Sequence, residues 1–228
     1  VVGGFDGGGR VVPAVRIYDP ASDRWSMGPP LPAPRHHVQL ADVGGTLVVA
    51  GGMRDLGFTP LRSVFVLRPG ADAWEEAADL PRARAAGPGG VVETALGARM
   101  VVAGGQGEGR SGDESLDDGR VVFVYDVGAD AWTEGAAMPT AREHCAGFVF
   151  EDELWVLGGR PISLEPTQST VEIYDPAGDV WRTGPTMPTP HGGFAATVVE
   201  GLAVVAGGEE RSRALDVVEL LDLNTMRW

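Results

Sequence analysis

Short apolar segments separated by glycine- and proline-containing turns run along the whole chain. Several of these segments, such as residues 46–50 and 153–157, end directly at a pair of glycines. No long segment has apolar residues at helical spacing, so the pattern predicts many short β-strands joined by tight turns. The 34 glycines and 17 prolines among the 228 residues favour the same all-β interpretation.

The glycine pairs belong to a repeat whose landmarks recur in fixed order every ~50 residues. The pairs are Gly3 and Gly4, Gly51 and Gly52, Gly104 and Gly105, Gly158 and Gly159, and Gly207 and Gly208. A tryptophan recurs at Trp25, Trp74, Trp132, Trp181 and Trp228, each preceded at a constant offset by Tyr18, Leu67, Tyr125, Tyr174 or Leu221. After a turn with proline come Arg35, Arg84, Arg142 and His191, one behind each of the first four tryptophans.

This order of Arg, Gly-Gly, Tyr-Asp and Trp resembles the kelch repeat, and the resemblance covers essentially the whole chain. Residues 138–159 and 187–208 look most like bacterial kelch-repeat proteins. The resemblance implies a β-propeller with blades of four antiparallel strands. It divides one domain, residues 1–228, into a partial unit at 1–30 and four complete units at 35–80, 84–137, 142–186 and 191–228. Because kelch propellers often have six blades, we expect a truncated fragment of a six-bladed ring that forms an open or imperfectly closed arc.

Each landmark has a physical reason in such a fold. A glycine pair allows positive φ and a close approach of the backbone of one blade to the next. The large indole ring of each tryptophan is expected to be buried between blades, which applies to Trp25, Trp74, Trp132 and Trp181. The repeat tyrosines Tyr18, Tyr125 and Tyr174 are expected to be buried in the same way.

Charge and cysteine content exclude several classes of function. The formal net charge of -14 repels phosphate backbones, so no nucleic-acid partner is expected. Cys145 is the only cysteine, which excludes an intrachain disulfide and a Cys-based zinc site. No apolar run approaches the ~18 residues that a membrane span needs. The chain opens at Val1 inside a repeat, which predicts truncation at both ends, and the resemblance alone favours an extracytoplasmic location.

The resemblance implies that ligands approach one end of the ring. The loops at this end come just before the first strand of each unit, which follows the landmark Arg or His, and just after the second strand, which ends at the glycine pair. The candidate ligand-binding residues on that face are Arg35, His37, Met53, Arg84, Gln106, Arg142, Glu143, His144, Arg160, His191 and Glu209. This set is rich in Arg and His in an otherwise acidic chain, so an acidic peptide or anionic sugar is slightly favoured as ligand.

An architectural role competes with ligand binding at Arg35, Arg84 and Arg142, because each occupies a repeat landmark. In that role the guanidinium groups would bind loop carbonyls of the adjacent blade. The residues outside the landmarks, His37, His144 and Arg160, are the stronger binding candidates.

No metal or other cofactor is expected. The four histidines do not have the spacing of a ligand set. The acidic segment 106–120 lacks the alternating carboxylates of a calcium loop and is expected to be a solvated insertion.

We expect a non-catalytic scaffold that recognises a protein, peptide or glycan. The first alternative is a sugar-acid isomerase similar to the sialic-acid mutarotases of the kelch fold, with Arg142, Glu143, His144 and Arg160 around its pocket. The second is the substrate-recognition propeller of a larger BTB- or F-box-type protein. No catalytic residue is assigned, because no catalytic triad pattern, phosphate loop or nucleotide fingerprint appears in the sequence.

Overall fold

The computed structural model describes residues 1–108, 119–161, 166–210 and 213–228. Within these ranges the secondary structure is β-strand with a single short 3₁₀ turn, which confirms the all-β prediction. The part of the chain that the structure describes contains no helix long and apolar enough to cross a membrane. The acidic segment discussed above lies mostly at 109–118, outside the described residues.

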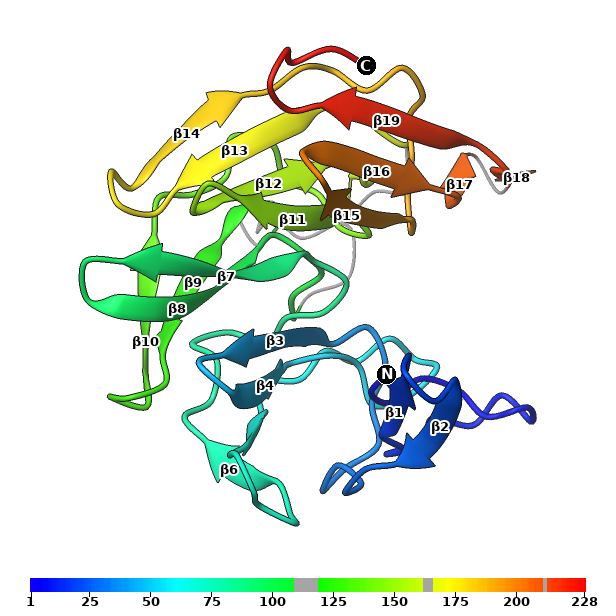
Figure 1. Cartoon of the computed structure of the whole chain (residues 1–228), viewed down its shortest axis with the longest axis vertical. Coiled ribbons are helices and arrows are strands. Elements are labelled where there is room, and N and C mark those ends of the chain that lie inside the picture. The colour runs from blue at the N-terminus through cyan, green and yellow to red at the C-terminus, as the bar shows by residue number, and fades with distance from the viewer. Residues whose placement is uncertain (109–118, 162–165, 211–212) are drawn as a thin grey trace.

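The strands form consecutive antiparallel sheets that follow one another around an arc, as in a β-propeller (Figure 1). Blade 1 holds β1 (Arg16–Asp19) and β2 (Arg24–Met27), and blade 2 holds β3 (Gln39–Val43), β4 (Thr46–Ala50), β5 (Val64–Leu67) and β6 (Glu75–Ala77). Blade 3 holds β7 (Gly89–Thr94), β8 (Gly97–Ala103), β9 (Val122–Asp126) and β10 (Ala131–Gly135). Blade 4 holds β11 (Ala146–Phe150), β12 (Glu153–Leu157), β13 (Val171–Asp175) and β14 (Val180–Thr183).

Blade 5 differs from the three four-stranded blades before it. Its sheet contains β15 (Ala195–Val199), β16 (Leu202–Ala206) and β19 (Val218–Asp222), and the small hairpin of β17 (Glu209–Glu210) and β18 (Arg213–Ala214) extends from it. Where the sequence predicts a fourth strand around Trp228, the structure has only an isolated bridge between Asp222 and Arg227. Blades 1 and 5 lie at the two ends of the arc (Figure 1).

The hydrophobic core lies between blades, since a single twisted sheet cannot cover its own two faces. Val48 and Val66 of blade 2, for example, pack in one buried cluster with Met100 and Phe123 of blade 3. Equivalent clusters join blade 3 to blade 4, blade 4 to blade 5 and blade 1 to blade 2. The first strands of blades 2 to 5, which are β3, β7, β11 and β15, lie against one another in that order.

The glycine pairs make the closest backbone contacts between blades. Gly51 has a φ of 60°, and a Cβ at this position would lie 2.1 Å from the carbonyl oxygen of Arg84. Its neighbour Gly52 donates its N–H to that same oxygen at 2.8 Å. The pairs ending at Gly105 and Gly159 bond the landmark residue of the following blade in the same way. The predicted positive φ is confirmed for all five pairs, and the close approach to the next blade is confirmed for the first four.

The repeat tryptophans attach each blade to the one before it. The indole N–H groups of Trp74, Trp132, Trp181 and Trp228 each donate to a carbonyl oxygen of the preceding blade, at 2.8–2.9 Å. Trp74 is buried, and Trp132 and Trp181 are half-buried. Because blade 1 has no preceding blade in this chain, the predicted burial is wrong for Trp25, which is 59% exposed, and for Tyr18, which is 44% exposed.

A carboxylate beside each repeat tyrosine adds a second link between blades. Asp179 accepts the hydroxyl hydrogen of Tyr174 at 2.6 Å and the backbone N–H of Ala136, in the preceding blade, at 2.5 Å. Asp130 accepts the equivalent pair of hydrogen bonds in blade 3. Within the described residues, Asp23 accepts the hydroxyl hydrogen of the exposed Tyr18 but no backbone N–H of another blade.

Asp179→Ala is expected to lower the free energy of unfolding by about 1 kcal/mol, because two hydrogen bonds are lost. Asp23→Ala is the matched control, since both residues have positive φ, and it should change stability by less than about 0.5 kcal/mol. Equal losses in urea denaturation would contradict the link between blades.

The effect of Asp179→Ala should also depend on pH. The hydrogen bond from Tyr174 and that from the Ala136 amide lower the pKa of Asp179 below its ordinary value of 3.8. The stability gained from the carboxylate is thus present above that value and is lost as the pH falls through the lowered pKa. The difference between wild type and variant should therefore shrink in strongly acidic buffer.

Candidate functional site

The landmark basic residues are buried, and their side chains connect two strands of their own blade. Arg142 donates to the carbonyl oxygens of Gly158 and Thr170 at 2.9 and 2.8 Å, and to the carboxylate of Glu172 at 2.9 Å. Arg35 bonds the corresponding carbonyls of Gly51 and Ser63. These carbonyls belong to the same blade as the arginine, so the sequence-based expectation of bonds to the adjacent blade is corrected for both residues.

His191 replaces arginine at this position in blade 5. Its Nδ1 lies 2.7 Å from the carbonyl oxygen of Gly207 and its Nε2 lies 3.3 Å from Glu219. A shorter basic side chain thus reaches the same glycine-pair carbonyl and a carboxylate of the neighbouring strand, which explains why histidine can stand here.

Two residues after each landmark, just before the first strand of the blade, the backbone adopts a left-handed conformation. His37, Ala86, His144 and Gly193 occupy this position with φ between 50° and 58°. The N–H of Ala86 donates to His37, that of His144 to Ala86, and that of Gly193 to His144, at 2.7–3.1 Å between N and O. This continuous series of backbone hydrogen bonds fixes where the four side chains begin.

These turns border an open cavity of about 640 Å³, which we call the mouth pocket. Its lining comes from blades 2, 4 and 5 and consists of His37, Phe58, His144, Arg160, Gly193, Gly208, Glu209 and Ala214. Because Ala86 stands between them in the series, the rings of His37 and His144 reach each other, with centroids 5.1 Å apart.

Arg160 is the centre of the charged network in the mouth pocket. Its Nε donates to Glu143 at 2.6 Å, and one terminal nitrogen donates to Glu209 at 2.7 Å. The other terminal nitrogen lies 3.3 Å from the ring of His144, whose Nδ1 is 2.7 Å from Glu143. The positive charge predicted for this face is therefore offset by two carboxylates.

The environment lowers the pKa of His37, which lines the pocket, and that of Glu143, which pairs with Arg160. Burial, with smaller contributions from His144 and His36, lowers the pKa of His37 to about 4, so this ring is uncharged at neutral pH. The pKa of Glu143 is lowered although burial acts to raise it, because the hydrogen bonds and charges of His144 and Arg160 outweigh the burial. Glu143 is thus held as a carboxylate beneath the pocket.

The candidate ligand-binding residues predicted from the sequence fall into two groups, one buried and one partly exposed to solvent. The buried members are Arg35, Met53, Arg84, Arg142, Glu143 and His191, whereas His37, Gln106, His144, Arg160 and Glu209 keep accessible surface. Gln106 lies beside the mouth pocket residue Phe58, with its side-chain amide 3.4 Å from the Phe58 carbonyl oxygen. Phe58, a 49% exposed aromatic residue, is not among the residues that the sequence predicts, and its signal is its place in a glycine-containing loop after a glycine pair.

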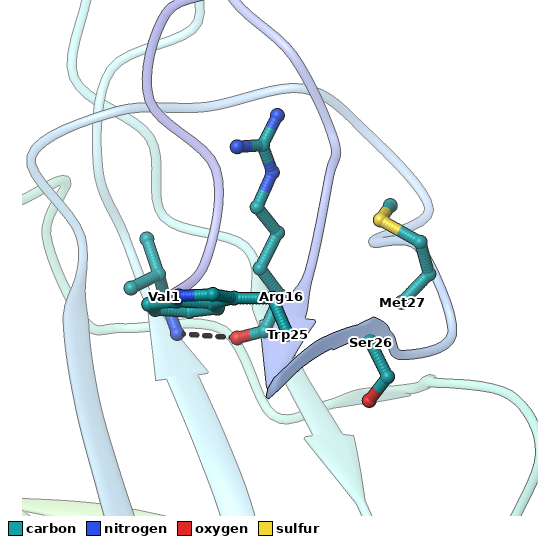
Figure 2. Close-up of a pocket in the computed structure, with 5 residues that line it drawn as sticks. All are labelled: Val1, Arg16, Trp25, Ser26 and Met27. Atoms are coloured by element: carbon teal, nitrogen blue, oxygen red, sulfur yellow. Dashed lines mark hydrogen bonds between the residues drawn. The ribbon is translucent and has the colours of Figure 1, made fainter. Parts of the chain in front are cut away.

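A second hollow, of about 490 Å³, lies at the open end of blade 1. Val1, Arg16, Trp25, Ser26 and Met27 line it, and the terminal ammonium of Val1 donates to the Arg16 carbonyl at 2.8 Å (Figure 2). Since the equivalent tryptophans pack on a preceding blade, this hollow is the open half of an inter-blade contact. We therefore keep it separate from the candidate binding site.

Comparisons with known proteins agree with the repeat and the fold. The family described as Kelch motif matches residues 1–32 and 141–188. Kelch-like protein 35 of Mus musculus is 30% identical over 74% of this chain, and Kelch-like protein 34 of Homo sapiens is 31% identical over 75% of it. This chain spans 26% of the length of each of these two relatives. N-acetylneuraminate epimerase of Brucella suis is 29% identical over 64% of this chain and 42% of its own length.

Proposed function

Since this chain belongs to the kelch-repeat family, we propose that it is a protein-interaction propeller that binds its partner through the mouth pocket. The observation that carries this proposal is the convergence of partly exposed side chains from three blades on one open cavity. The backbone positions of His37 and His144 are fixed by the series of hydrogen bonds that begins at His37, so these two side chains are held ready for a ligand. The Kelch-like relatives support a protein as partner.

The test replaces the two pocket histidines in a way the fold already accommodates. Ala86 occupies the equivalent left-handed position in blade 3, so His37→Ala combined with His144→Ala should leave the free energy of unfolding within about 1 kcal/mol. The double variant should bind a partner captured by the wild-type chain about tenfold more weakly or worse, measured by calorimetry.

Arg182→Ala, on the outer strand β14, serves as the binding control and should retain wild-type affinity. Unchanged affinity of the histidine double variant would place the contact elsewhere and overturn the proposal.

A second candidate function, sugar-acid isomerisation, is favoured by two observations. The Glu143–His144 pair is a hydrogen-bonded carboxylate and imidazole next to an arginine, a set suited to proton transfer and carboxylate binding. The similarity to the Brucella epimerase adds a relative that acts on a sugar acid. Anomer exchange of N-acetylneuraminate, followed by NMR with and without the protein, tests it; an unchanged exchange rate rejects this function.

We also propose two variants of this function: binding of a glycan, and substrate recognition as the propeller of a larger BTB- or F-box-type protein. Either would use the same mouth pocket as the recognition surface. The acidic preference predicted from the sequence has little electrostatic support, because Glu143 and Glu209 already pair with Arg160.

A further inference from the structure

We propose that the mouth pocket receives a basic side chain, an arginine or a lysine, projected by the partner protein. This inference rests on the proposed function, and it names the chemistry of the residue that the pocket recognises.

The positive charge of Arg160 is already neutralised by two carboxylates, which makes it a weak attractor for an anionic ligand. Two of its nitrogens donate to Glu143 and Glu209, and the third faces the ring of His144. An incoming carboxylate would bring a third negative charge next to the two carboxylates that already neutralise this guanidinium. Like-charge contacts of this kind oppose binding.

Glu209 offers the opposite chemistry. Its side chain is 40% exposed, and its Oε1 is the oxygen that pairs with Arg160. Among the described residues, Oε2 of Glu209 accepts no hydrogen bond. A guanidinium or ammonium group that enters the cavity would donate a charge-assisted hydrogen bond to this Oε2 atom.

Aromatic rings line the same cavity as this carboxylate. Phe58 is 49% exposed and lines the pocket together with the rings of His37 and His144. A cation over an aromatic face is attracted by the ring quadrupole, and the hydrocarbon part of a long basic side chain packs on the same surface. The low pKa of His37, about 4, keeps that ring from repelling a cation at neutral pH.

The charge of the whole chain acts in the same direction. A formal net charge of -14 attracts a basic segment from a distance and raises its rate of association. Direct contact with the carboxylates of the mouth pocket then selects a basic side chain, which attraction by the net charge of the chain cannot do.

The experiment uses three capped tripeptides as probes: acetyl-Gly-Arg-Gly-amide, its isosteric citrulline form, and acetyl-Gly-Glu-Gly-amide. Binding to the full chain is followed by NMR shifts of the backbone amides of Gly193 and Gly208, which line the cavity. The arginine peptide should shift both amides, and the citrulline and glutamate peptides should bind about tenfold more weakly, since they lack the positive charge.

Two variants that each remove one negative charge distinguish binding to the Glu209 carboxylate from attraction by the net charge of the chain. Glu209→Gln should weaken binding of the arginine peptide by about fivefold. Glu134→Gln, on the outer strand β10 where Glu134 pairs with Arg82, should leave it unchanged. If the two variants weaken binding equally, attraction by net charge alone is the explanation and the inference is overturned.

The outcomes also separate this inference from the proposed function. If the glutamate peptide shifts the two amides and the arginine peptide does not, the pocket binds ligands but the basic preference is overturned. If none of the peptides shifts them, the inference is overturned, and the histidine double variant with a captured partner decides the proposed function independently.

Discussion

Arg142→Ala is expected to lower the free energy of unfolding by about 3–5 kcal/mol, among the largest losses of any single substitution in this chain. The guanidinium is completely buried and donates to carbonyl oxygens at the ends of two strands as well as to Glu172, whose side chain is only 5% exposed. Removing it leaves a buried carboxylate without its counter-charge and buried carbonyls without donors. Urea denaturation monitored by tryptophan fluorescence measures the loss.

Arg182→Ala is the control for removing an arginine. Arg182 also pairs with a glutamate, Glu153, but its side chain is 48% exposed, so its loss should cost less than about 1 kcal/mol. A loss for Arg142→Ala as small as that for Arg182→Ala would show that the landmark arginine does not hold the blade together.

Trp132→Ala is expected to cost about 3–5 kcal/mol, by loss of packing between blades 2 and 3. The indole packs against the core cluster shared by these blades, stacks on Tyr125 with centroids 4.6 Å apart, and donates to the carbonyl oxygen of Ala78 at 2.8 Å. Alanine leaves a cavity at the interface and an unpaired carbonyl on the preceding blade.

Trp25→Ala provides the comparison at the same repeat position. Because Trp25 is 59% exposed and has no preceding blade in this chain to pack against, its loss should cost less than about 1 kcal/mol. Similar losses for the two substitutions in a denaturant melt would mean that the tryptophan stabilises its own blade and not the contact between blades.

The fold was predictable because its landmarks act through short-range geometry. Glycine pairs, repeat tryptophans and strand-forming apolar runs have the same neighbours in each blade, so one repeat predicts the next. The exceptions, Trp25 and Tyr18, depend on whether a preceding blade is present, which local sequence does not encode. The carbonyls that Arg35 binds in its own blade do not follow from the sequence, because spacing gives distance along the chain and not the direction of a side chain.

The candidate site was predictable only in part. The positions of His37, His144 and Arg160 at one end of the blades follow from the repeat, and the structure brings these residues to one cavity. The pairing of Arg160 with Glu143 and Glu209 did not follow, because these glutamates are 17 and 49 residues away along the chain and the repeat spacing does not give the direction of a side chain. As a result, the sequence predicted a positive face where the structure places a network with two carboxylates for one guanidinium.

The series of backbone hydrogen bonds through His37, Ala86, His144 and Gly193 has a consequence for how this family can evolve new specificities. The turn at each position is held by main-chain atoms, and the chain itself carries histidine, alanine and glycine there. Exchanges at His37, His144 and Gly193, which line the mouth pocket, therefore change its chemistry at little cost to folding when the new residue tolerates the left-handed conformation. Recognition can diversify while stability is kept, and a library that offers His, Asn, Asp, Ala and Gly at these three positions should yield mostly folded proteins with different ligand preferences.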